Sequence, residues 1–158
     1  MIEILNYNSR NTPYNLIANL LNQLQVSNNS LSSREELFIK DICNRVCKSK
    51  SVLYLLIIDG IVVGLVALSV TTIEEQPSLQ IDYIFISDKY RGKSMKILEN
   101  NKPFRYLIKM TISIAEEISK NVGLRYIVLS PDNDTLKEKY IRVGFENLTD
   151  NYMNFKLK

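Results

Sequence analysis

Apolar and polar positions in the first fifty residues predict one strand followed by two helices. Residues 2–7 alternate between apolar and polar side chains, which suits a short strand. Thr12-Pro13 is typical of a helix start, and aliphatic residues then recur at helical spacing from residue 16 to residue 24. A second helix is expected from Ser33, because its hydroxyl and Glu36 form a capping-box pattern.

The middle of the chain predicts three strands. Residues 52–58 and 61–71 are rich in β-branched side chains, and Asp59-Gly60 joins them. An Asp-Gly pair between two such runs is the strongest short-range signal for a hairpin. A loop at 74–78 then leads into another strand at 79–86.

The second half predicts alternating helices and strands. A polar, partly basic stretch at 87–102 precedes a long helix at 104–122 and a buried strand at 125–130. The segment 131–134 starts a short helix that ends at Gly144, and two closing strands follow at 145–148 and 152–157. The order is βαα, three strands, then αβαββ. No repeat or linker divides it, so we expect one domain over residues 1–158.

Composition excludes several kinds of site. The 158 residues are 46% hydrophobic and 23% charged, as in ordinary globular proteins. Histidine is absent, which removes Ser-His-Asp catalysis, Cys-His catalysis and histidine-ligated zinc. The two cysteines, Cys43 and Cys47, cannot form a disulfide framework or complete a four-ligand metal site, so no metal is expected.

Charge and hydropathy bear on partners and location. The formal charge of +3 is too weak by itself to imply a nucleic-acid partner. No secretory signal is visible, and the longest apolar stretch, 52–70, is interrupted by Asp59, Gly60 and Gly64. We therefore expect a cytoplasmic protein with no membrane partner.

Four motifs carry a resemblance to a known family. An Asp-Gly turn is followed by a Val-Gly pair within 57–64, and the strand ending Ile-Phe-Ile-Ser leads to Tyr-Arg-Gly-Lys within 84–93. The stretch 133–145 resembles the signature N-x-x-A-x-x-x-Y-x-x-x-G-F, and 151–155 resembles an aromatic last strand. Over nearly the whole chain, this order resembles the GNAT (Gcn5-related N-acetyltransferase) superfamily of acyl-CoA-dependent N-acyltransferases.

The resemblance implies an α/β (α+β) fold with a mixed central sheet of six to seven strands flanked by four helices. In that fold the fourth and fifth strands splay apart at a β-bulge and leave backbone groups without strand partners. Those groups pair with the pantetheine arm of coenzyme A as another strand would. The corresponding backbone here belongs to Ile84, Phe85 and Ile86, whose side chains we expect in the core.

The resemblance also implies a pyrophosphate-binding loop at the start of the third helix. The residues that correspond to it are Arg91, Gly92, Lys93 and Ser94. The loop is degenerate, because Ser94 and Lys96 replace its signature glycines and Pro103 stands where the family is already in mid-helix. Either its cations still form a cradle for phosphates, or its lysines are a solvated surface.

Three residues are candidates for the remaining chemistry. Tyr140 matches the family tyrosine that protonates the coenzyme A sulfur, although a tyrosine packed against the core is the alternative. Asn133 matches the position that contacts the cofactor arm, and it would also suit a helix cap. The resemblance implies a catalytic glutamate, in some family members, at about the position of Gln80, and glutamine cannot act as a base. Asp82 lies one step further on the same strand face and is the candidate general base; an exposed strand carboxylate is the alternative.

The resemblance therefore implies an N-acetyltransferase that passes the acetyl group of acetyl-CoA directly to an amine of a small molecule or peptide. The alternative is a catalytically degenerate module of the same fold that binds a metabolite or protein without turnover. Acetyl-CoA and an amine-bearing substrate are the expected partners, and no nucleic acid is expected. The oligomeric state is left open, a homodimer included.

Overall fold

The computed structural model describes residues 1–28, 30–149 and 151–158. The chain forms two compact units. The first unit contains Met1–Leu68 and Asp82–Leu107, and the second contains Ser69–Ile81 and Ile108–Lys158. Each unit is described by itself below.

The observed elements follow the predicted order, and the strands pair in the order β1-β2-β3-β4-β5-β7-β6. Two short 3₁₀ turns, η1 (Asp88–Tyr90) and η2 (Lys96–Leu98), lie in the stretch before the third helix. The strands and α-helices are β1 (Ile2–Tyr7), α1 (Leu16–Ser27), α2 (Ser33–Cys47), β2 (Val52–Ile58), β3 (Ile61–Ile73), β4 (Gln76–Ile86), α3 (Pro103–Ser119), β5 (Tyr126–Leu129), α4 (Asp134–Arg142), β6 (Glu146–Asn147) and β7 (Met153–Lys156).

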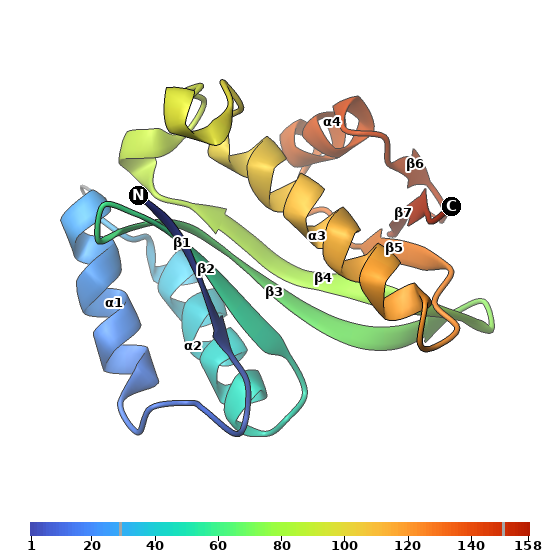
Figure 1. Cartoon of the computed structure of the whole chain (residues 1–158), viewed down its shortest axis with the longest axis horizontal. Coiled ribbons are helices and arrows are strands. Elements are labelled where there is room, and N and C mark those ends of the chain that lie inside the picture. The colour runs from blue at the N-terminus through green and yellow to red at the C-terminus, as the bar shows by residue number, and fades with distance from the viewer. Residues whose placement is uncertain (29, 150) are drawn as a thin grey trace. The chain divides into compact units, whose positions relative to one another are not determined.

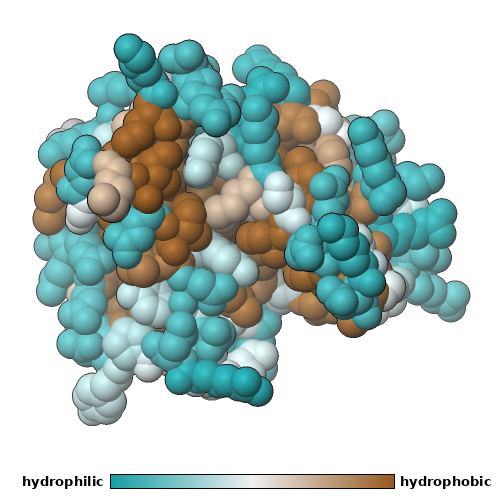
Figure 2. Space-filling view, in the orientation of Figure 1, coloured by the Kyte–Doolittle hydropathy of each residue, from teal (hydrophilic) through white to brown (hydrophobic). Residues whose placement is uncertain are grey.

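In the first unit, α1 and α2 cover one face of the antiparallel strands β1, β2 and β3 (Figure 1). The leucines of α1 and the apolar face of α2 are buried against alternate residues of β2 and β3. At the predicted hairpin, Asp59 and Gly60 both have positive φ, 50° and 80°. Two positive φ values match the right-handed twist of the flanking strands. Figure 2 shows apolar side chains reaching the surface near the end of this unit where Figure 1 marks the N-terminus.

In the second unit, β4 and β5 are parallel, and the other pairings are antiparallel. Ser78–Gln80 of β4 pair with Tyr126–Val128 of β5, and β7 pairs with β5 and β6. The predicted loop at 74–78 is shorter in the structure. Glu74 and Glu75 form the turn with positive φ of 50° and 64°, so β4 already begins at Gln76.

Two helix starts differ from their prediction. The first helix begins at Leu16, because the Thr12 hydroxyl donates a hydrogen bond to the Asn8 carbonyl and does not cap the helix. The capping box of the second helix uses Ser32 and Glu35, each one residue before its predicted counterpart, Ser33 and Glu36. Among the described residues, no helix has the length and apolar character needed to cross a membrane.

Candidate functional site

Arg91, which follows β4, is held by four groups of the first unit. Its Nε donates to the Ile86 carbonyl at 2.6 Å. Its terminal nitrogens pair with Glu35 at 2.8 Å and with Asp88 at 2.9 Å. The guanidinium carbon also lies 5.2 Å from the centre of the Phe85 ring, within cation–π range. The charge of this arginine is therefore balanced by protein groups, and its side chain fastens the turn after β4 to α2.

A second set of bonds fastens the same turn to the end of α1. The Asp88 amide donates to Oδ1 of Asn28 at 2.8 Å, and Nδ2 of Asn28 donates to the Leu24 carbonyl at 2.6 Å. Asn28 is 7% exposed, so this amide is buried with both ends bonded. Lys89 adds a bond from Nζ to the Val26 carbonyl at 3.0 Å. The start of the predicted phosphate loop is thus rigidly attached to the helical layer.

The remainder of the loop departs from the family's arrangement, as the sequence predicts. Gly92 has a φ of 72°, and Lys93 and Ser94 are exposed. The chain then forms the turn η2, anchored by the fully buried Leu98, before α3 begins at Pro103. Ser94 therefore lies ahead of a 3₁₀ turn and does not lie at the N-terminus of α3. Phosphate binding here would depend on loop amides and lysines without the dipole of a long helix.

The end of β4 lies in the core of the first unit. Phe85 and Ile86 are 4% and 9% exposed, and Ile84 is half-buried, as expected for their side chains. The backbone is also closely surrounded, because the Phe85 carbonyl oxygen lies 2.9 Å from where a Cβ on Gly64 would stand. The Ile86 carbonyl accepts from Arg91. The pairing of this backbone with a pantetheine arm stays a prediction.

Asp82, the predicted general base, is a buried and paired carboxylate. Its Oδ2 accepts a 2.8 Å hydrogen bond from Ser51, its Oδ1 lies 3.7 Å from Arg45, and its side chain is 5% exposed. The alternative of an exposed carboxylate is therefore wrong. Its neighbour Tyr83 stacks on Phe38 of α2 at 5.1 Å, so both residues have a contact with this helix.

Tyr140, the predicted acid, lies in the core of the second unit. It is 3% exposed, and its ring meets the edge of Phe145 at 5.4 Å, while Phe145 packs on Phe155 at 5.5 Å. Burial raises the pKa of Tyr140 well above its usual value, and the nearby Asp132 carboxylate raises it further. The phenol therefore stays protonated at neutral pH, as a proton donor must. The ring has the packing role that the sequence left as the alternative, and the acid role stays a prediction.

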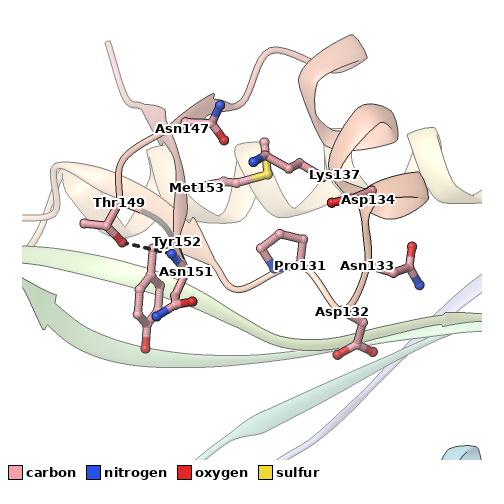
Figure 3. Close-up of a pocket in the computed structure, with 10 residues that line it drawn as sticks. All are labelled: Pro131, Asp132, Asn133, Asp134, Lys137, Asn147, Thr149, Asn151, Tyr152 and Met153. Atoms are coloured by element: carbon pink, nitrogen blue, oxygen red, sulfur yellow. Dashed lines mark hydrogen bonds between the residues drawn. The ribbon is translucent and has the colours of Figure 1, made fainter.

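Asn133 caps α4, as expected. Its Oδ1 accepts from the Leu136 amide at 2.9 Å. The same residue lines a pocket of about 180 Å³ in the second unit, and its contact with a cofactor arm stays a prediction (Figure 3). The pocket is formed by the turn after β5, two residues of α4, one residue each of β6 and β7, and the segment that connects these two strands. Its lining residues are Pro131, Asp132, Asn133, Asp134, Lys137, Asn147, Thr149, Asn151, Tyr152 and Met153.

The cysteines and the acidic residues supply no metal site in the described part of the chain. Cys43 is buried, and burial raises the pKa of its thiol to about 12, with a smaller contribution from Cys47. A thiol with this pKa is neutral at pH 7 and a poor nucleophile. The burial of Cys43 supports a packing role for its side chain.

Sequence reasoning missed Asn28, Glu35 and Asp132. A signal existed for Glu35, because Ser32 and Glu35 match the capping-box spacing as well as Ser33 and Glu36 do. Asp132 lies two residues after the end of a predicted buried strand, where an acidic side chain is worth testing as a site residue. Nothing local indicates that Asn28 would be buried.

Comparisons with known proteins bear on the fold. No protein-family model matches the sequence, and no curated protein matches it. Solved structures do. A mutant AtaT toxin bound to the C-terminus of the antitoxin AtaR and acetyl-CoA matches at 16% identity with a TM-score of 0.73, over 99% of this chain and 94% of that one. The AtaT–AtaR complex bound to DNA matches at 17% identity with a TM-score of 0.72, over 99% and 94%. AtaT complexed with acetyl-methionyl-tRNAfMet matches at 14% identity with a TM-score of 0.73, over 99% and 95%.

These similarities establish the fold. The chain has the GNAT fold of its structural neighbours, with a mixed seven-stranded sheet, four helices and parallel strands β4 and β5. The prediction of the fold is confirmed.

One prediction about partners is corrected. The sequence led us to expect no nucleic acid, whereas among neighbours of the same fold the AtaT–AtaR complex is bound to DNA and AtaT is complexed with acetyl-methionyl-tRNAfMet. The physical reason for the error is that net charge averages over the whole chain. Phosphates respond to the local distribution of cations, which a formal charge of +3 does not describe.

Proposed function

We propose that this protein is an N-acetyltransferase that transfers the acetyl group of acetyl-CoA directly to a primary amine. The observation that carries the proposal is the match of 99% of the chain to the fold of AtaT, which is bound to acetyl-CoA in two of the similar structures. Acetyl-CoA is therefore the co-substrate, and we place the reaction in the cytoplasm.

For the acceptor we propose the α-amine of an aminoacyl-tRNA. The support is the neighbour of the same fold that holds acetyl-methionyl-tRNAfMet, whose acetyl group is on the amino acid. An α-amine has a pKa near 8, so a substantial fraction is neutral and nucleophilic at physiological pH. A small-molecule or peptide amine is the broader acceptor class that the sequence suggests.

Each unit contributes residues to this proposal. In the first unit, we assign the cofactor contacts to the backbone of Ile84, Phe85 and Ile86 and to the loop Arg91–Ser94, where Lys93 and Ser94 are exposed. Because Arg91 already has carboxylate partners, we assign it the role of holding this loop in place.

In the second unit, we assign the proton donor to Tyr140 and a cofactor contact to Asn133. Direct transfer is favoured over an acyl-cysteine intermediate because the Cys43 thiol is buried and its pKa is about 12. Asp82 is the sequence's candidate base, but its bonds to Ser51 and Arg45 favour a structural role.

The experiment has two stages. Calorimetric titration with acetyl-CoA measures binding, and transfer of labelled acetyl groups to methionyl-tRNAfMet measures activity. Tyr140→Phe is expected to bind acetyl-CoA normally and to transfer about 10²–10⁴-fold more slowly, the range for loss of a general acid. Full activity in Tyr140→Phe would contradict the acid role.

A non-catalytic module is the second candidate, and the contacts of Arg91 favour it. A residue expected to meet phosphates is instead paired with Glu35 and Asp88, and the loop lacks its signature glycines. Binding of acetyl-CoA without transfer to any amine would support the module. Undetectable binding at millimolar acetyl-CoA would overturn the transferase.

A further inference from the structure

The pocket of the second unit has a chemical character that suits an amine. Its lining is polar, with amides, hydroxyls and three charged side chains, and only Pro131 and Met153 are apolar. Two of the charged groups are carboxylates, Asp132 and Asp134, and one is the ammonium of Lys137. The described lining is therefore net negative. Its volume of about 180 Å³ has room for several water molecules or for the polar end of a small molecule.

Asp132 lies away from the lysine within the pocket. Figure 3 places Lys137 beside Asp134, while Asp132 lies at the lower right of the view and the ring of Tyr152 at the lower left. The Thr149 hydroxyl accepts from the Asn151 amide at 3.4 Å, which shapes the wall beside Tyr152. A cation that enters at the Asp132 end thus meets a carboxylate before it meets the lysine.

Asp132 differs from Asp134 in its relation to Tyr140. It lies in the turn between β5 and α4, and its charge contributes to the raised pKa of the buried Tyr140 phenol. Asp134 is the first residue of α4, where a carboxylate interacts favourably with the helix dipole. An ammonium held by Asp132 would therefore stand close to the group we assign as proton donor.

We propose that this pocket holds the acceptor amine as its ammonium form, with Asp132 as the carboxylate that binds it. The inference rests on the proposed function. It identifies the Asp132 carboxylate as the group that selects the enzyme's substrate class, which is primary amines that are cationic near neutral pH. A charge-assisted hydrogen bond between a carboxylate and an ammonium is about twice as strong as a neutral one. Asp132 then selects an amine over an equally sized alcohol, and it holds the nitrogen until a proton leaves to water and the amine becomes nucleophilic.

The test uses the whole chain and two small probes, L-methioninamide and its α-hydroxy analogue, which differ only in the amine. At pH 6 the amine is protonated. In a ¹⁵N NMR titration, methioninamide is expected to shift the backbone amide signals of residues 132–134, 147–149 and 151–153, and the hydroxy analogue is expected to shift them much less. Asp132→Asn should weaken methioninamide binding at least about tenfold, and the matched control Asp134→Asn by less than about threefold.

Several results would overturn the inference. They are shifts confined to other residues, equal binding of the two probes, or equal losses in the two variants. A general folding defect is recognised because it would change the amide spectrum of the unliganded variant throughout the chain. Failure of the proposed function is read separately, as absent acetyl-CoA binding or transfer while methioninamide still binds at Asp132. The KM for methionyl-tRNAfMet should rise in Asp132→Asn with an unchanged affinity for acetyl-CoA.

Discussion

Replacing Arg91 with methionine separates two candidate roles of this residue. In the first role, called the clasp below, its bonds to Ile86, Glu35 and Asp88 stabilise the folded protein; in the second it binds phosphate. Methionine keeps much of the side-chain length but removes the charge and all donors. If Arg91 is a clasp, the ligand-free protein loses stability. If it serves only to bind phosphate, the ligand-free protein is unaffected, because a ligand contact contributes nothing in the absence of ligand.

The magnitude follows from the contacts. The 2.6 Å bond from Nε to the Ile86 carbonyl is a hydrogen bond from a charged donor, worth about 1.5–3 kcal/mol. The pairs with Glu35 and Asp88 involve a guanidinium whose side chain is 46% exposed, so each adds less than about 1 kcal/mol. These contributions overlap, and we expect a loss of about 2–3 kcal/mol in the free energy of unfolding. For a chain of this size, the melting temperature would fall by about 4–12 °C.

Urea unfolding of the ligand-free protein, followed by circular dichroism, measures the loss. Tyrosine fluorescence is the second probe, because the chain has no tryptophan. Lys93→Met is the matched control, since Lys93 is an exposed cation of the same loop, and its change should stay within about 0.5 kcal/mol. Equal, near-zero changes in the free energy of unfolding of both variants would refute the clasp role and would favour phosphate binding as the role of Arg91.

Three further predictions concern single positions. Partial burial raises the pKa of Glu35, but the hydrogen bonds it accepts from Ser32 and Arg91 lower that pKa overall. The ionised carboxylate should therefore stabilise the folded protein above pH 4.5, the ordinary pKa, and this stabilisation should be lost as pH falls through the folded pKa. The urea midpoints of wild type and Glu35→Gln should converge on acidification. Gly64→Ala should lower the free energy of unfolding by about 1–3 kcal/mol, because the new Cβ would lie 2.9 Å from a backbone oxygen. Gly123→Ala is the control, since the space around Gly123 is open, and it should leave the free energy of unfolding nearly unchanged. Similar losses in both variants would contradict this explanation. Iodoacetamide at pH 8 should label the exposed Cys47 and should not label Cys43 until the protein is unfolded. Mass spectrometry detects the labelled residues, and rapid labelling of Cys43 in the native protein would contradict its burial.

The sequence determined most of the elements because their signals are local. The Asp59-Gly60 turn lies between two β-branched runs, and Asn133 caps the following helix; both are read from neighbouring residues, and both are confirmed. The family signature at 133–145 and the strand order likewise predicted the GNAT fold. Ser94, Lys96 and Pro103 predicted an unusual loop before the third helix, which the structure has.

Tertiary structure decided which side chains are bonded to one another. The capping box could use Ser32 or Ser33 by local rules, and the box that forms is the one whose Glu35 also binds Arg91, 56 positions away. Asn28 becomes a buried support because Asp88, 60 positions away, donates to it. Local sequence patterns specify backbone conformation through dihedral preferences and the spacing of apolar residues. A hydrogen-bond partner from a distant segment is specified only when folding brings the two segments together, so these partners could not be predicted from the sequence alone.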